Sequence, residues 1–288
     1  MSRFNYRMNF EGLVKNTYPI NVVRPYDSGR DTRIILPNRP DRTSLNGTLD
    51  KYLDRNTLLA IIYSNPEITR MLAEKGIPLN VNVDGFKKHV YNHSVDTKNT
   101  AIAIYNNLPA NVKSQADLKD IADGALLHDV GKILIPDAIL TKRNKLSPKE
   151  EDIMRLHSTL SYELLKNQGI SDNALKIVRY HHQNPAHLGY PAMSDTEKMD
   201  INSQIVSMAD KYSALREKRS YKRQMSEEEA LKILASELNK GVSPDVYNAL
   251  ASYAANGKVN NQNTATLSNY LDRKNAVPQI NKNTTFFA

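Results

Sequence analysis

Histidine and aspartate cluster in this chain in a way that suits metal chemistry. The sequence has seven histidines in 288 residues, and two dense groups stand out, His128-Asp129 and His181-His182. Imidazole nitrogens and carboxylates suit borderline first-row ions such as iron, manganese or zinc. Two such ions a few ångströms apart are a common device for the attack of water on a phosphodiester. The candidate ligands for two adjacent ions are His93, His128, Asp129, His157, His181, His182 and Asp210.

Each candidate ligand lies within or at the end of a predicted helix. His93 falls within 84–108, His128-Asp129 at the end of 115–129, His157 within 148–167, His181-His182 after the helix that Ser171 caps, and Asp210 within 202–215. Taken alone, His157 would be an ordinary surface or core histidine, and Asp210 a cap or an ion-pair member. A carboxylate in an apolar helix is costly to bury unless it is paired or coordinated. Jointly the segments favour one centre, since a helical bundle can converge such side chains.

Helix start signals recur along the chain and predict an all-α fold. Ser147 with Glu150 and Ser226 with Glu229 form capping boxes. Further helices are predicted from about residue 49 to 65, from 66 to 75 with Gly76 as the stop, and from 244 to 256. The inward positions of the 84–108 helix are predicted to be Val90, Val95, Ile102 and Tyr105.

Composition limits the classes of protein that fit. The absence of cysteine excludes disulfides, thiolate metal sites and cysteine nucleophiles. No apolar stretch is long enough to span a bilayer, and no secretory signal is evident, so we expect a cytoplasmic location. The net charge of +8 comes mostly from the two ends of the chain, which predicts solvated arms rather than a groove for a nucleic acid polymer.

The same patterns divide the chain into three parts. Residues 1–83 form an N-terminal extension that is irregular and then helical. Residues 84–255 form the domain that carries the candidate ligands. Residues 256–288 are rich in asparagine and lack a sustained apolar period, so we expect them to be disordered.

Three separated motifs resemble those of the HD-GYP family of cyclic di-GMP phosphodiesterases. The stretch His128–Pro136 is similar to the family's HD signature, and Gly189-Tyr190-Pro191 is similar to its second signature. The block 210–215, followed by 219–222, resembles a third. The resemblance covers about residues 84–255. It implies an all-α HD bundle acting as a bacterial hydrolase in second-messenger signalling.

The resemblance also implies roles for individual residues. One metal ion would be held by His93, His128, Asp129 and Asp210. The other would be held by His157, His181 and His182, with Asp129 bridging both and a bridging hydroxide as the nucleophile. Lys132 would donate to a phosphate oxygen or protonate the leaving alkoxide, although alone it would be an ordinary helix-terminus cation. The residues expected to bind substrate are Lys132, Tyr190, Arg219 and Lys222.

Some positions depart from the family's pattern. Gln183 stands where the family often has glutamate, and Ala186 and His187 stand where it usually has aspartate and glycine. Losing the glycine changes the loop backbone if that site needs a positive φ. His89 falls where some relatives carry an acidic residue associated with an additional metal. His89 stands four residues before His93 and so shares its predicted helix face, but we favour an exposed histidine and predict no third ion.

The function that the resemblance implies is hydrolysis of cyclic di-GMP to pGpG, with further hydrolysis to GMP. Two alternatives remain open. One is hydrolysis of another nucleotide, such as a different cyclic dinucleotide, because the loop before Gly189 is altered. The other is a non-catalytic module that binds a nucleotide, or a signalling partner such as a diguanylate cyclase, through the Gly189-Tyr190-Pro191 loop.

Overall fold

The described part of the chain is built entirely of helices joined by loops. The computed structural model describes residues 49–217 and 224–256, and no strand occurs within these ranges. The helices are η2 (Lys51–Leu53), α2 (Arg55–Ser64), α3 (Pro66–Glu74), α4 (Val83–His89), α5 (Tyr91–Asn106), α6 (Ala110–Lys113), α7 (Leu118–Leu127), η3 (Val130–Leu134), α8 (Asp137–Leu140), α9 (Pro148–Leu165), α10 (Asp172–Tyr180), α11 (Ile201–Arg216), α12 (Glu227–Leu234), η4 (Ala235–Lys240) and α13 (Pro244–Asn256). The predicted all-α class is confirmed. The predicted disordered tail lies outside the described residues.

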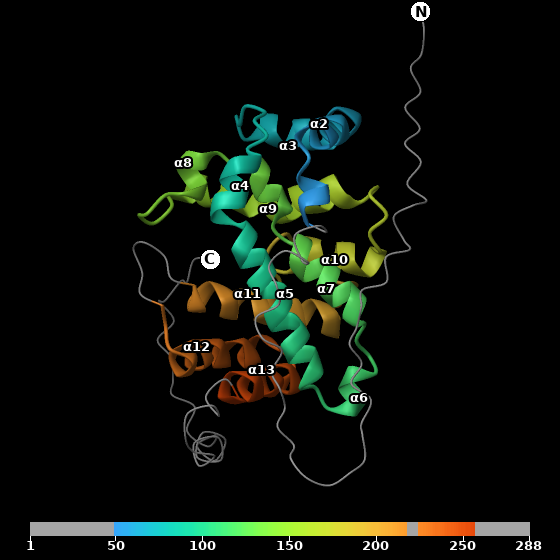
Figure 1. Cartoon of the computed structure of the whole chain (residues 1–288), viewed down its shortest axis with the longest axis vertical. Coiled ribbons are helices and arrows are strands. Elements are labelled where there is room, and N and C mark those ends of the chain that lie inside the picture. Colours follow the sequence, from blue (N-terminus) through green and yellow to red (C-terminus); the bar gives the residue numbers. More distant parts are fainter. Residues whose placement is uncertain (1–48, 218–223, 257–288) are drawn as a thin grey trace, which may run out of the picture.

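Helix α5 is the central element of the fold. It packs against α4, α7, α11 and α13, and it runs through the middle of the molecule in Figure 1. Elsewhere in the bundle, α9 packs against η3 and α10, and α10 packs against α7. The helices that carry the candidate ligands are therefore neighbours in space.

The predicted helix starts are confirmed where a polar side chain caps the first turn. Ser147 and Ser226 each form a capping box. The side chain of Ser171 accepts a hydrogen bond from the backbone of Ala174. Asn65 caps α3, which has Pro66 at its first position. These caps satisfy backbone N–H groups that the helix itself leaves without partners.

The predicted single helix over 84–108 is wrong. The chain bends at Val90, whose φ of −120° ends α4 before α5 begins at Tyr91. His89 therefore ends a different helix from the one that carries His93, and the inference that both share one helix face is also wrong. His89 is exposed, which agrees with our preference for an exposed histidine.

The buried face of α5 also differs from the predicted one. Val90 is buried as expected, but Val95, Ile102 and Tyr105 are only partly buried. The buried residues of α5 are His93, Ser94, Thr97, Lys98, Thr100, Ala101 and Ile104. Helix α5 thus turns a largely polar face inward, and this face carries His93 to its contact with Asp210, so the apolar period was misleading.

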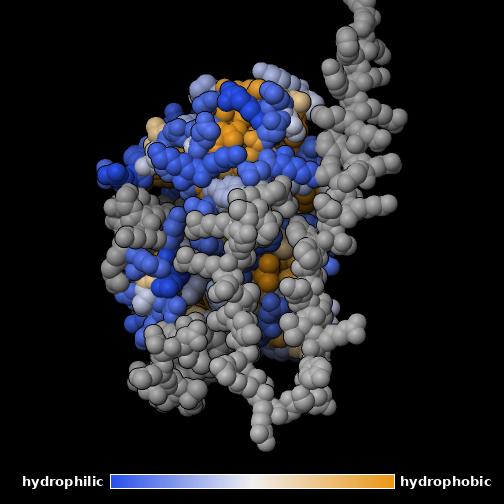
Figure 2. Space-filling model, in the orientation of Figure 1, coloured by the Kyte–Doolittle hydropathy of each residue, from blue (hydrophilic) through white to orange (hydrophobic). Residues whose placement is uncertain are grey.

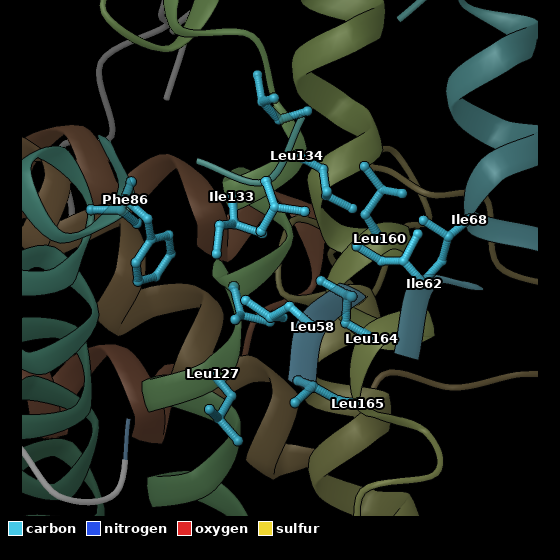
Figure 3. Packing of buried hydrophobic residues seen from close by; sticks show 14 of the residues in the cluster. Leu58, Ile62, Ile68, Phe86, Leu127, Ile133, Leu134, Leu160, Leu164 and Leu165 are labelled. Atoms are coloured by element: carbon cyan, nitrogen blue, oxygen red, sulfur yellow. The ribbon is translucent and has the colours of Figure 1, made fainter. Parts of the chain in front are cut away.

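Two apolar clusters hold the bundle together. In the first, Leu58 and Ile62 of α2 and Ile68 of α3 pack with Leu160 and Leu164 of α9, as Figure 3 shows. Burying one such side chain contributes about 1.5–3 kcal/mol. The described residues before 84, which are 49–83, thus share a core with α9 rather than forming a detached unit.

The second cluster joins the lower helices in Figure 1. It contains apolar residues of α5, α7, α11, α12 and α13. Helices α7 and α10 contribute to both clusters: Ala125 and Ile177 belong to the second, whereas Leu126 and Val178 belong to the first. The chain segments that follow α7 and α10 are therefore anchored on two sides, and these segments carry candidate ligands.

The surface is mainly polar in the view of Figure 2, with a smaller apolar area at the upper end near α2 and α3. Among the described residues, no helix has the length and apolar character needed to cross a membrane.

Candidate metal centre

Separate helices bring the predicted ligands to one buried place. His93 lies on α5, His128 and Asp129 follow α7, His157 lies on α9, His181 and His182 follow α10, and Asp210 lies on α11. All of them are buried except His182, whose side chain is only 9% exposed. The convergence that the sequence predicted is therefore present in the structure.

Asp129 occupies the middle of this group. Its Oδ2 lies 3.1 Å from His128 Nε2 and 3.9 Å from His93 Nε2. Its Oδ1 lies 3.3 Å from His157 Nε2 and 4.0 Å from His181 Nε2. The two oxygens of one carboxylate thus face two different sets of imidazoles, which is the arrangement that a bridging carboxylate needs.

The remaining carboxylate, Asp210, closes the group from α11. Its Oδ1 lies 2.9 Å from His93 Nε2 and 3.7 Å from His128 Nε2. Its Oδ2 lies 3.8 Å from His182 Nδ1. On the other side of the site, His157 Nε2 lies 3.2 Å from His181 Nε2 and 3.1 Å from His182 Nε2.

Three overlapping sets of side chains have ligand atoms within 4.8 Å of one another. The sets are His157, His181 and His182; His93, His128 and Asp129; and His128, His181 and Asp210. The first set contains the three imidazoles predicted for one ion, and the second contains three of the four residues predicted for the other. The third joins residues from both, so the two halves form one continuous centre.

Backbone carbonyls fix the orientation of three imidazoles. His128 Nδ1 lies 2.7 Å from the carbonyl of Ala125, and His157 Nδ1 lies 2.7 Å from that of Met154. His181 makes the same kind of contact with a carbonyl three residues earlier, at 2.8 Å. Because a carbonyl only accepts, Nδ1 must carry the proton, which leaves the Nε2 lone pair free to bind an ion.

Several buried atoms at the centre lack a hydrogen-bond partner among the described residues. They are His93 Nδ1, His128 Nε2, Asp129 Oδ1 and Asp210 Oδ2. A buried polar atom without a partner costs free energy, and an ion would supply the missing contact for the ligand atoms. The donor set of imidazole nitrogens and carboxylate oxygens fits divalent iron, manganese or zinc.

Both carboxylates are held in the charged form. Burial acts to raise the pKa of Asp129, but the charges of His128 and Lys132 outweigh it and hold that pKa well below its ordinary value. Burial likewise acts to raise the pKa of Asp210, and the hydrogen bond with His93 and the charge of His128 hold it well below its ordinary value. Negative charge is therefore available to bind cations.

The imidazoles divide into two kinds. Burial, aided by the charge of Lys132, lowers the pKa of His157 to about 4. Burial and the neighbouring imidazoles also hold the pKa values of His181 and His182 well below the ordinary value. These three are neutral near pH 7, as metal ligands must be. For His128, burial acts to lower the pKa, but the charge of Asp129 outweighs it and raises that pKa, so an ion would compete with a proton there.

A family model for the HD domain matches residues 86–246, which is more than half of the chain. The chain belongs to the HD domain family. Its matched part contains every predicted metal ligand.

Three relatives of this HD protein illustrate the similarity. A cyclic di-GMP phosphodiesterase of Thermotoga maritima is 36% identical over 138 residues, covering 47% of this chain and 38% of that protein. The cyclic di-GMP phosphodiesterase response regulator RpfG of Xanthomonas campestris is 35% identical over 140 residues, with 48% and 37% covered. The 3'3'-cGAMP-specific phosphodiesterase 2 of Vibrio cholerae is 32% identical over 143 residues, with 49% and 27% covered. The HD protein thus matches less than two fifths of the length of each relative.

Lys132 lies at the candidate metal centre, as predicted. Its Nζ lies 2.8 Å from Asp129 Oδ2, and its side chain is 19% exposed. It is therefore a cation that reaches both the buried carboxylate and the surface. That position suits the predicted role toward a phosphate.

A glycine allows the HD segment to approach α9 closely. The backbone N–H of Gly131 donates to Ser161 Oγ at 2.7 Å. A Cβ at this position would lie 2.2 Å from the carbonyl oxygen of His157 and 2.5 Å from the backbone nitrogen of Ser161. The glycine after the HD pair therefore sets the distance between Asp129 and His157. Sequence reasoning missed the contribution of Ser161, whose signal is its place four residues after His157 on one helix face.

The loop with Gly189, Tyr190 and Pro191 lies against the candidate metal centre. The Tyr190 ring lies 4.6 Å from the His182 ring, and 6.2 Å from the His157 ring in an edge-on arrangement, both measured between centroids. Burial raises the pKa of Tyr190, so its phenol keeps its proton and can donate a hydrogen bond.

Gln183 fastens this loop, a role that sequence reasoning missed. It is 1% exposed. Its Oε1 accepts from the backbone N–H of Gly189 at 2.9 Å, and its Nε2 donates to the carbonyl of Pro191 at 2.8 Å. The signal was the departure from glutamate, since an ionised carboxylate could accept from Gly189 but could not donate to Pro191.

His187 takes the backbone conformation that a glycine would favour. Its φ is +55°, which is uncommon for a residue with a side chain. The neighbouring backbone is held by Asn184, whose Oδ1 accepts from Ala186 and Leu188 at 3.1 and 3.2 Å. The loss of glycine at 187 is thus tolerated at a positive φ rather than avoided.

Two predicted substrate-binding residues, Arg219 and Lys222, lie outside the described residues. His89 lies at the exposed end of α4 and does not belong to any of the ligand sets described above.

Proposed function

We propose that this chain is a metal-dependent phosphodiesterase that hydrolyses cyclic di-GMP to linear pGpG, with further hydrolysis to GMP. The observation that carries the proposal is the convergence of imidazoles and carboxylates on one buried centre. It is supported by relatives named as cyclic di-GMP phosphodiesterases. We further propose residues 84–255 as the catalytic domain and the cytoplasm as its location.

We propose that two divalent ions bind at this centre. His93, His128, Asp129 and Asp210 would hold one, and His157, His181 and His182 would hold the other, with Asp129 shared. The opposite orientation of the two Asp129 oxygens supports this division. Such ions lower the pKa of water and offset negative charge on a phosphodiester. The ligand types favour iron, manganese or zinc.

The chain's own residues would position the substrate and move protons. Lys132 Nζ is placed to hydrogen-bond a phosphate oxygen or to give a proton to the leaving alkoxide. The protonated phenol of Tyr190 would donate to the substrate at the edge of the site. Arg219 and Lys222 remain predicted phosphate-binding residues. Binding of a diguanylate cyclase at the Tyr190 loop likewise stays a prediction.

A second candidate substrate is 3'3'-cGAMP. Relatives from Vibrio cholerae are named as phosphodiesterases specific for it. The loop beside the centre differs from the family's pattern at Gln183 and His187, and its Tyr190 ring lies 4.6 Å from the ring of the predicted ligand His182.

The test combines elemental analysis with a substrate panel. Protein purified without oxygen would be analysed for iron, manganese and zinc, and then assayed on cyclic di-GMP, 3'3'-cGAMP and cyclic di-AMP. We expect turnover of cyclic di-GMP and loss of both metal and turnover in Asp129→Ala. Preferred cleavage of 3'3'-cGAMP would favour the second candidate. Tight binding of one nucleotide without cleavage of any would show a binding module instead.

A further inference from the structure

Arg155 lies over the ring of Tyr190, outside the set of predicted ligands. Its guanidinium carbon lies 5.1 Å from the centroid of that ring, a distance typical of a cation–π contact. Arg155 belongs to α9 and precedes His157 by two residues. Its long side chain therefore extends from the helix that holds a ligand to the loop that covers the centre.

Tyr190 connects Arg155 to the centre. The Tyr190 ring lies 4.6 Å from the His182 ring and inclined by 30° to it. Arg155 is therefore placed one aromatic ring away from a predicted metal ligand. A substrate group that extends from the ions past Tyr190 would meet this guanidinium.

The guanidinium of Arg155 has capacity left for a ligand. Arginine has five N–H donors, and Arg155 forms an ion pair with Glu151 one turn earlier on α9. The Arg155 side chain is 48% exposed, and such exposed pairs contribute little to stability. A phosphate could therefore bind Arg155 through two parallel hydrogen bonds, the geometry that arginine favours.

A cyclic dinucleotide carries two phosphodiesters, and only the one being cut needs to contact the ions. We propose that Arg155 is a further substrate-binding residue, and that it holds the phosphodiester that is not being cut. This inference rests on the proposed function. It predicts that Arg155 matters for substrates with two phosphodiesters and not for substrates with one.

The alternative is that Arg155 only supports Tyr190. The two roles differ in their effect on bis(p-nitrophenyl) phosphate, a substrate with a single phosphodiester. If Arg155 binds the second phosphodiester, Arg155→Ala raises the KM for cyclic di-GMP by about 10- to 100-fold, as expected for a charged hydrogen bond. The KM for bis(p-nitrophenyl) phosphate then stays unchanged. If Arg155 only supports the loop, both substrates suffer alike.

Two further variants sharpen the test. Arg155→Lys keeps the positive charge and most of the packing but loses the two parallel hydrogen bonds, so we expect a smaller rise in KM for cyclic di-GMP. Arg179→Ala is the matched control because Arg179 lies 4.9 Å from the centroid of Tyr162 and thus makes the same kind of contact elsewhere. We expect Arg179→Ala to leave the ratio of the two KM values unchanged.

The outcomes separate this inference from the proposed function. A selective rise in KM for cyclic di-GMP in both Arg155 variants supports it. Equal KM values in the wild type and both Arg155 variants, with cyclic di-GMP turned over, overturn the inference alone. An equal loss on both substrates also overturns it, because Arg155 then acts only through the loop. Wild-type protein that cleaves bis(p-nitrophenyl) phosphate but no cyclic dinucleotide overturns the proposed function and the inference with it.

Discussion

Substituting Gly131 by alanine should damage the centre through the backbone. The added Cβ would lie 2.2 Å from the carbonyl oxygen of His157 and 2.5 Å from the backbone nitrogen of Ser161. Neither atom is at the end of a flexible side chain, so relief of the overlap requires η3 and α9 to separate by roughly 1 Å. That movement carries Asp129 away from His157, whose facing atoms are 3.3 Å apart.

Gly131→Ala should lower both the free energy of unfolding and the catalytic rate. Added volume in a packed interior costs about 1–3 kcal/mol of unfolding free energy. A misplacement of about 1 Å in a catalytic group can cost about 100-fold in rate. We therefore expect Gly131→Ala to fold with reduced stability, to bind less metal and to lose turnover far beyond what its stability explains.

Gly169→Ala provides the control for this prediction. Gly169 has a φ of +73° and no atom within 4 Å of the position of an added Cβ, so alanine there strains the backbone without a clash. The assays are thermal unfolding with and without manganese, elemental analysis and turnover. A Gly131→Ala protein with wild-type metal content and rate would refute the reasoning, and so would a Gly169→Ala protein with the same losses.

Three other predictions follow from single contacts. Lys132→Met should keep its metal content in elemental analysis while kcat falls by about 10²- to 10⁴-fold; loss of metal would contradict the assigned role. Gln183→Leu should lower the unfolding free energy by about 1–3 kcal/mol, because the backbone groups of Gly189 and Pro191 lose buried partners. An unchanged urea midpoint would show that these two hydrogen bonds do not stabilise the fold. Burial acts to raise the pKa of Glu237, but the charge and hydrogen bond of Lys211 outweigh it and lower that pKa. The contribution of Glu237 to the free energy of unfolding is therefore present above its unfolded pKa and is lost as pH falls through its folded pKa. The difference in unfolding free energy between wild type and Glu237→Gln should be larger at pH 7 than at pH 4. Equal differences at the two pH values would contradict this prediction.

Features with a local cause could be predicted from the sequence. The caps at Ser147, Ser171 and Ser226 depend on contacts within one turn, and the structure has them where the sequence placed them. The ligand candidates could also be identified from the sequence, because histidines are few and the two dense groups, His128-Asp129 and His181-His182, stand at predicted helix ends. These inferences needed no knowledge of how the helices pack.

Features with a distant cause could not be predicted. The inward polar face of α5 depends on the helices that α5 contacts, which are α4, α7, α11 and α13. The same holds for Gln183, whose side chain bonds to residues six and eight positions away in a loop. The sequence showed that Gln183 is unusual, but only the folded loop shows that both ends of its amide are used.

The carbonyl contacts of the histidines explain why the centre is preorganised for ions. His128, His157 and His181 each direct Nδ1 to a backbone carbonyl three residues earlier. Once these helical segments form, the tautomer and the ring orientation are set by backbone rather than by another side chain. The ordering of these imidazoles is therefore part of folding. An ion that arrives meets Nε2 lone pairs of His157 and His181 already facing Asp129, whereas at His128 it must also displace a proton, because the charge of Asp129 raises the pKa of that imidazole.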